Sequence, residues 1–69
     1  MDKFAQMVKD YMRDKYPARY RQLIKDKYLN QFCQSRANQA YKEKAALIRF
    51  GMMDFEADEI VIKDMLTIP

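Results

Sequence analysis

The sequence predicts an all-α protein, a small bundle of three or four helices that forms a single domain over residues 1–69. Three observations support this fold class. Apolar residues recur at helical spacing along most of the chain. The two prolines and the single glycine fall where those patterns end. The one stretch with strand-like composition, residues 59–63, would have no second strand with which to pair.

A proline separates the first two helices. Residues 2–15 place their apolar side chains on one stripe at helical spacing, and Asp2 suits the N-cap position. Pro17 ends this helix because the residue before a proline is disfavoured in the α region. The same proline suits the first position of a second helix over residues 17–28, where a missing N–H costs nothing.

The third helix is expected over residues 30–50, with Asn30 as its N-cap. Its apolar and polar residues fall on opposite arcs, and Gly51 is a natural stop because glycine adopts positive φ without a Cβ penalty. The break before this helix contains neither glycine nor proline. One bent helix over residues 17–50 is therefore an alternative.

The last helix is expected over residues 54–66, with Asp54 as its N-cap. Acidic residues occupy its first turns, where the helix dipole favours negative charge. Residues 67–69 should form a loose tail. The stripes of the helices together predict a buried set, which comprises Leu23, Ile24, Ala37, Ala40, Tyr41 and Leu47.

The last helix is apolar over an unusually wide arc. One face carries Ala57, Ile60, Val61 and Met65, whereas Phe55, Ile62 and Leu66 point roughly to the other side. A helix of this kind is buried on two sides, and a chain this short can cover one of them. We therefore predict a partner interface at those last three residues, with a homodimer or another protein as the partner. In the alternative, the helix over residues 17–28 crosses over and covers this face within one chain.

Charge is divided unevenly along the chain. Residues 13–49 contain ten lysines and arginines against three acidic residues, a net charge of +7, and residues 50–69 contain one lysine against five acidic residues, a net charge of −4. The simplest interpretation is that the acidic helix docks on the basic part of the same chain or of another copy. Nucleic-acid binding is the less favoured alternative. Its candidate surface comprises Arg19, Arg21, Lys25, Lys42 and Arg49.

Such binding would be largely independent of sequence. The clearest helix–glycine–helix junction is at Gly51, and the helix after it is acidic, so the major groove would repel it. Phosphate contacts from the basic helices would then supply most of the affinity.

Composition argues against several functional classes. The chain has no histidine, one serine and one cysteine, Cys33, which lies on an apolar stripe where a thiol is inert. We therefore expect a non-enzymatic protein without catalytic residues, metal or cofactor. No apolar run approaches the ~20 residues that span a bilayer. The first residues lead into an amphipathic pattern instead of an apolar signal segment, so we expect a cytoplasmic protein with no membrane role.

Three segments resemble a family of short, uncharacterised helical proteins carried on bacterial conjugative transposons. In that family a first helix ends in Tyr-Leu-Arg-x-x-His-Pro, a later helix reads Phe-Ile-x-x-Arg-Ala-x-x-Ala before a glycine, and a final helix contains Glu-Ala-x-Glu-Ile. The matching segments here are Tyr11-Met12-Arg13-Asp14-Lys15-Tyr16-Pro17, then Phe32-Cys33 with Arg36-Ala37 and Ala40, then Gly51-Met52 with Glu56-Ala57 and Glu59-Ile60. Tyr16 replaces the histidine, and residues 18–29 depart from the pattern. The resemblance implies a mobile-element setting and carries no site residues, because the family has no known activity.

Overall fold

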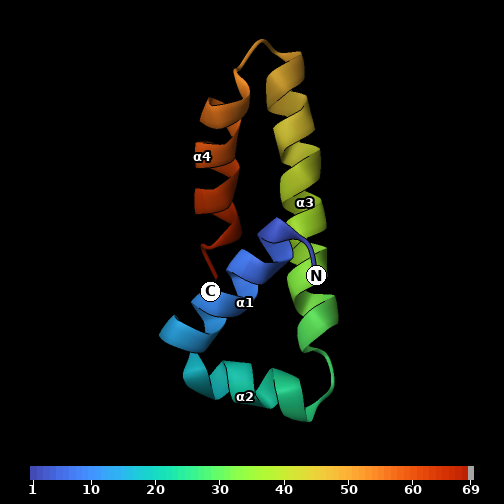
Figure 1. Cartoon of the computed structure of the whole chain (residues 1–69), viewed down its shortest axis with the longest axis vertical. Coiled ribbons are helices and arrows are strands. Elements are labelled where there is room, and N and C mark those ends of the chain that lie inside the picture. Colours follow the sequence, from blue (N-terminus) through green and yellow to red (C-terminus); the bar gives the residue numbers. More distant parts are fainter. Residues whose placement is uncertain (69) are drawn as a thin grey trace.

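A long central helix organises the computed structural model, which describes residues 1–68. The helices are α1 (Lys3–Lys15), α2 (Pro17–Lys25), α3 (Leu29–Arg49) and α4 (Asp54–Met65), so the predicted all-α fold is confirmed. Figure 1 shows α4 antiparallel to α3 beside its upper half, α1 crossing its lower half, and α2 lying across the lower end. The molecule is elongated, with extents of 42 × 18 × 18 Å.

The helix α1 begins at the predicted cap and lies against the middle of α3. The backbone N–H of Ala5 donates to Asp2 Oδ1 at 2.8 Å, which confirms Asp2 as the N-cap. The ring of Phe4 stacks on that of Tyr41 in α3, with centroids 4.5 Å apart. The helix ends before Pro17, as the sequence predicts.

The turn between α2 and α3 is closed without glycine. Lys27 adopts a φ of 59°. Its N–H donates to Ile24 O at 3.0 Å, and the N–H of Tyr28 donates to Leu23 O at 2.9 Å, which is the hydrogen-bond pattern of a Schellman motif. The chain therefore turns here, and the alternative of one bent helix over residues 17–50 is wrong. The predicted N-cap at Asn30 is also wrong, because Tyr28 occupies that position.

The turn between α3 and α4 repeats the same pattern with glycine. Gly51 has a φ of 99°, and its N–H donates to Ile48 O at 2.9 Å. The N–H of Met52 donates to Leu47 O at 3.1 Å, so this turn is also a Schellman motif. The predicted N-cap at Asp54 is wrong by one residue, because Met53 precedes the first residue of α4.

One apolar cluster joins α1, α3 and α4. Its buried members are Phe4, Ala5, Val8, Met12, Leu29, Cys33, Ala37, Ala40, Val61, Met65 and Ile68. Of the predicted core, Ala37 and Ala40 are buried, while Leu23 and Leu47 are half-buried against the cluster. The prediction is wrong for Ile24 and Tyr41, whose exposed fractions are 50% and 38%. Ile24 lies on an exposed side of α2. Tyr41 stacks on Phe4 of α1 through one face of its ring, and part of its side chain still faces solvent.

The segment after α4 is packed, so the predicted loose tail is wrong for Thr67 and Ile68. Ile68 is only 5% exposed, and Tyr16 Oη donates to its carbonyl oxygen at 3.2 Å. The guanidinium of Arg36 donates to Met65 O through Nε at 2.9 Å and Nη2 at 2.7 Å. These contacts tie the segment to Tyr16, between α1 and α2, and to α3. Pro69, which the tail prediction also includes, lies outside the described residues.

Candidate functional site

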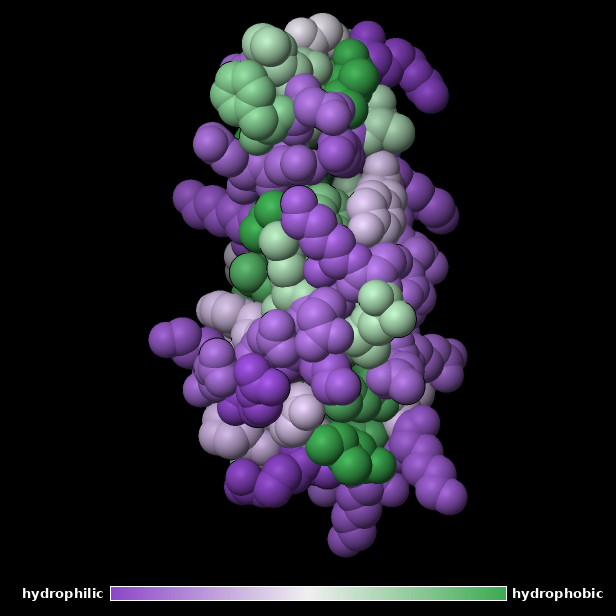
Figure 2. All heavy atoms as spheres, viewed as in Figure 1, coloured by the Kyte–Doolittle hydropathy of each residue, from purple (hydrophilic) through white to green (hydrophobic). Residues whose placement is uncertain are grey.

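The upper end of the molecule carries a group of exposed apolar side chains. Phe50, Met53 and Phe55 are 87%, 60% and 59% exposed and lie in or beside the turn between α3 and α4. Figure 2 shows hydrophobic atoms gathered at this end, above a face that is mostly hydrophilic. We call these three residues the apolar tip. Large adjacent apolar side chains left in solvent are typical of interaction sites.

The structure separates the three residues of the predicted partner interface. Ile62 and Leu66 are half-buried and pack against the core cluster, to which α1 and α3 both contribute. Phe55, on the same side of α4 but nearer the turn, is exposed. The core of the same chain thus covers the lower part of this face of α4. The cover does not come from α2, which the alternative prediction had crossing over this face. Phe55 instead joins the apolar tip.

The seam between α3 and α4 is charged. Lys44 Nζ lies 2.9 Å from Asp58 Oδ1 and 4.0 Å from Asp54 Oδ1, and the Asp58 carboxylate raises the pKa of Lys44. The acidic helix therefore docks on the basic part of its own chain, as the simplest interpretation of the charge division predicts. Because Lys44 neutralises part of the acidic charge, less of it is left for a second molecule.

A shallow groove follows the same seam further down. Glu43 on α3 and Asp64 on α4 both line it, with Arg36 and Ser35 beside them. A hydrogen bond with Asp64, together with burial and the charge of Asp64, raises the pKa of Glu43. The proximity of Asp64 therefore makes the charged form of Glu43 less favourable. Among the described residues, no group of three or more histidine, cysteine, aspartate or glutamate side chains is placed to hold a metal ion.

The single thiol lies in the core. Cys33 is fully buried on α3, and burial raises the pKa of its thiol. A thiol with a raised pKa and no access to solvent is a poor nucleophile, so Cys33 serves packing.

The five residues of the predicted nucleic-acid surface are all exposed but spread along the molecule. Arg19, Arg21 and Lys25 lie on α2 at the lower end. Lys42 and Arg49 lie on α3, and Arg49 is the last residue of that helix, about 30 Å along its axis from the first. The structure therefore gathers three of the five at one end and places the other two along the exposed side of α3.

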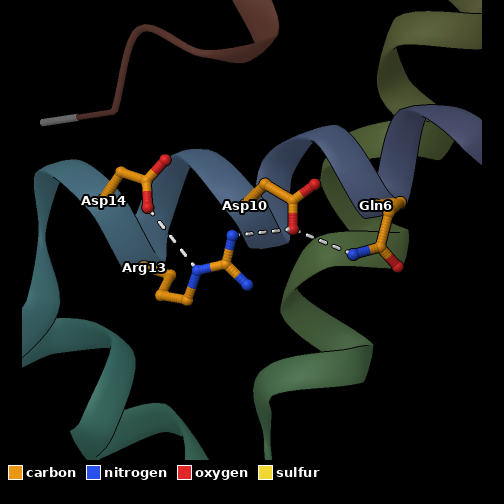
Figure 3. Close-up of polar contacts among 4 residues, drawn as sticks. All are labelled: Gln6, Asp10, Arg13 and Asp14. Carbon is orange, nitrogen blue, oxygen red and sulfur yellow. Dashed lines mark hydrogen bonds and ion pairs between the residues drawn. The ribbon is translucent and has the colours of Figure 1, made fainter.

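Arg13 adds little to this positive end. Figure 3 shows its guanidinium between two carboxylates of α1, with Nη2 3.5 Å from Asp10 Oδ1 and Nε 3.5 Å from Asp14 Oδ1. Gln6 Nε2 also donates to Asp10 Oδ1 at 3.0 Å. The charge of Arg13 is thus compensated locally, and the excess positive charge belongs to residues 15–28. That segment contains five lysines and arginines against one aspartate.

Sequence reasoning missed two groups of residues. Phe50 and Met53 were assigned no role, although their position beside Gly51 indicates that they are too close to a tight turn to reach the core. The other group is a row of neutral polar side chains on the exposed side of α3. Its members Gln31, Ser35 and Asn38 follow one another at helical spacing and are all exposed.

Across the residues that the structure describes, no helix has both the length and the apolar character needed to cross a membrane. Comparisons with protein-family models, with curated proteins and with solved structures gave no match for this chain.

Proposed function

We propose that this protein is a non-enzymatic interaction module that self-associates through its C-terminal helix and the turn before it. The observation that supports this proposal is the exposure of Phe50, Met53 and Phe55 beside one another at the upper end. Burying one large apolar side chain stabilises a complex by about 1.5–3 kcal/mol. Three such side chains from each of two copies can offset the cost of association, about 4–15 kcal/mol.

A second copy of the chain suits this surface as a partner. A two-fold dimer brings the same patch together from both copies, so the patch has to be complementary to itself. Both signs of charge flank the apolar tip in the sequence, because Arg49 precedes it and Glu56 follows it. Opposite charges can therefore meet across a two-fold axis and fix the orientation. The resemblance to proteins of conjugative transposons supports a setting on a mobile element.

The test compares two variants that add negative charge at opposite ends of the molecule. Phe50→Glu combined with Phe55→Glu should give a monomer whose circular dichroism is unchanged, because both side chains are exposed in the single chain. Ile24→Glu, at an exposed apolar residue of α2, is the control at the other end and should leave association intact. Light scattering over a range of protein concentrations measures the mass. A parent protein that is monomeric at every concentration, or a control that dissociates equally, would show that the tip is not the interface.

A second candidate function is nucleic-acid binding by the lower end, which we propose because of its concentrated positive charge. Phosphate contacts release counterions, so such binding should weaken steeply as salt concentration rises. Association through the apolar tip should not, because apolar burial depends little on charge screening. Titrations of the protein with duplex DNA at several salt concentrations distinguish these two kinds of binding. Absence of binding even at low salt would eliminate this function.

A further inference from the structure

The junction between α2 and α3 has the form of a DNA-binding motif. Two helices are joined by the three residues between Lys25 and Leu29, and Figure 1 shows α2 lying across the lower end of α3. Lys27 in this turn has a positive φ, at a place where helix-turn-helix motifs often use glycine. In that motif the second helix enters the major groove of DNA, and residues near its N-terminal end contact the bases.

We propose that α2 and α3 form a helix-turn-helix that binds duplex DNA, with α3 in the major groove. This inference rests on the second proposed function, nucleic-acid binding. It goes further, because it assigns a base-reading face to α3 where the sequence predicts contacts with phosphates alone.

The reading face comprises Gln31, Ser35 and Asn38. They lie at positions i, i+4 and i+7 of α3, so they share one side of the helix, and all three are exposed. The core residues Cys33 and Ala37 lie on the other side. Carboxamides of glutamine and asparagine both donate and accept, and they pair with the adenine edge in the major groove. A serine hydroxyl can contact either a donor or an acceptor.

Basic side chains flank this face on two helices. The guanidinium carbon of Arg19 in α2 lies 5.5 Å from the ring centroid of Phe32, the residue after Gln31, which holds Arg19 beside the first turn of α3. On the other flank, Lys9 of α1 lines a shared groove with Gln31. Lys42 continues the exposed side of α3 one turn beyond Asn38. In protein–DNA complexes, basic side chains that contact the phosphates on both sides of a groove position the helix that reads the bases.

The carboxylates close to the reading face have hydrogen-bond or ion-pair partners within the chain, and Asp26 in the turn accepts from Gln22 Nε2. Residues 27–42 contain no aspartate or glutamate. Of the nearby carboxylates, Asp2 accepts from Ala5 N and from Gln34 Nε2, and Asp10 lies beside Arg13. Glu43 faces Asp64 in the groove on the α4 side. The face therefore matches a polyanion in charge, unlike α4, whose first turns are acidic.

The shape of the nucleic acid also matters. The major groove of B-DNA, about 12 Å wide, admits an α-helix. The major groove of an RNA duplex is deep and narrow, so it excludes one. The proposal is thus specific to duplex DNA, and an RNA duplex of the same sequence is the natural comparison.

The test is a selection with the full chain from a pool of DNA duplexes whose central segment is randomised. We expect a defined sequence to be enriched and to bind more tightly than its scrambled version and than the same sequence as duplex RNA. Gln31→Ala should reduce discrimination at one base pair by about 5- to 150-fold, while leaving binding to scrambled DNA unchanged. Arg21→Ala and Lys25→Ala should weaken binding to both duplexes alike.

Gln22→Ala is the matched control, because Gln22 is an exposed glutamine of α2 whose amide donates to Asp26 in the turn that follows. It should not change base preference, and circular dichroism should show that every variant keeps its helices. Salt-dependent binding with no enriched sequence would overturn the reading face and leave the second proposed function standing. Equal or tighter binding of duplex RNA would likewise exclude α3 as a major-groove reader. Absence of any DNA binding would overturn both the reading face and the second proposed function.

Discussion

The two ends of α3 carry the same backbone turn built from different residues. At the upper end Gly51 takes the positive φ, and at the lower end Lys27 does, with matching pairs of hydrogen bonds around each. The helices that these turns join to α3, namely α2 and α4, differ from each other more than the turns do. The acidic α4 buries Ala57, Val61 and Met65 in the core, whereas none of the residues of α2, all of which the structure describes, is buried.

This difference indicates what holds each helix in place. The helix α4 is fixed by apolar burial, by its ion pair with Lys44 and by the contacts of Arg36 beyond its C-terminus. The helix α2 depends on its turn and on half-buried residues such as Leu23. Elements with few buried contacts open locally at low free-energy cost. A rigid upper end and a more adaptable lower end are what we expect for an association surface and a DNA-contacting motif, respectively.

The largest effect should come from truncating a core residue of α4. Met65→Ala removes a buried side chain and should lower the free energy of unfolding by about 2–5 kcal/mol. Ile24→Ala removes a comparable volume from the exposed side of α2 and should change stability by no more than about 0.5 kcal/mol. Denaturant titrations of both variants measure the contrast. Similar losses at the two sites would show that α2 is as firmly packed as α4.

The second effect concerns the upper turn. Gly51→Ala should lower the free energy of unfolding by about 1–2 kcal/mol, because a residue with a Cβ is strained at this positive φ. An added Cβ would meet no atom within 4 Å, so steric clash does not contribute. Ala46→Gly, at an exposed position within α3, is the control for the general effect of exchanging these two residues. A Gly51→Ala variant as stable as the parent would mean that the turn adopts another conformation.

The number and type of the helices could be predicted because they rest on apolar spacing, one proline and one glycine. The first helix illustrates this well, since Asp2 and Pro17 mark its two ends as the sequence indicates. The turn at Lys27 was harder to place, because lysine carries no local signal for a positive φ. That conformation is stabilised by hydrogen bonds to Leu23 and Ile24 across the turn.

The candidate surfaces were less predictable than the helices, because they depend on where the helices end in space. The spacing of Phe55, Ile62 and Leu66 correctly places them on one side of α4, but it does not show that the core covers the last two. Similarly, the polar arc of α3 is visible in the sequence. Its position beside Arg19 and Lys9 follows from the packing of α2 and α1 against α3.

The third effect concerns the lower turn. Unlike the two substitutions above, this one should stabilise the protein. Lys27→Gly should raise the free energy of unfolding by about 0.5–1 kcal/mol, because relief of strain exceeds the extra entropy of glycine in the unfolded chain. Lys27→Ala removes the same charge but keeps the strain, so it should be close to neutral. Hydrogen exchange of the α2 amides provides a local readout and should slow in the glycine variant alone. Equal stabilisation by glycine and alanine would indicate that charge, and not backbone conformation, is responsible.

The smallest effect concerns Glu43, which lies where α4 meets α3. The hydrogen bond with Asp64 raises the pKa of Glu43, so the folded chain binds this proton more tightly than the unfolded chain does. The resulting stabilisation is present below the ordinary glutamate pKa and is lost as pH rises through the raised value. Glu43→Gln supplies an N–H donor to Asp64 at every pH. It should therefore stabilise the protein relative to the parent near pH 7, and the gain should shrink at about pH 4, where Glu43 regains its proton. Glu59→Gln, at an exposed residue of α4, removes the same charge and controls for long-range electrostatics. Unfolding titrations of the three proteins at both pH values provide the measurement. If the two variants have the same pH dependence, Glu43 and Asp64 do not share a proton, and the contact between them does not contribute to holding α4 against α3.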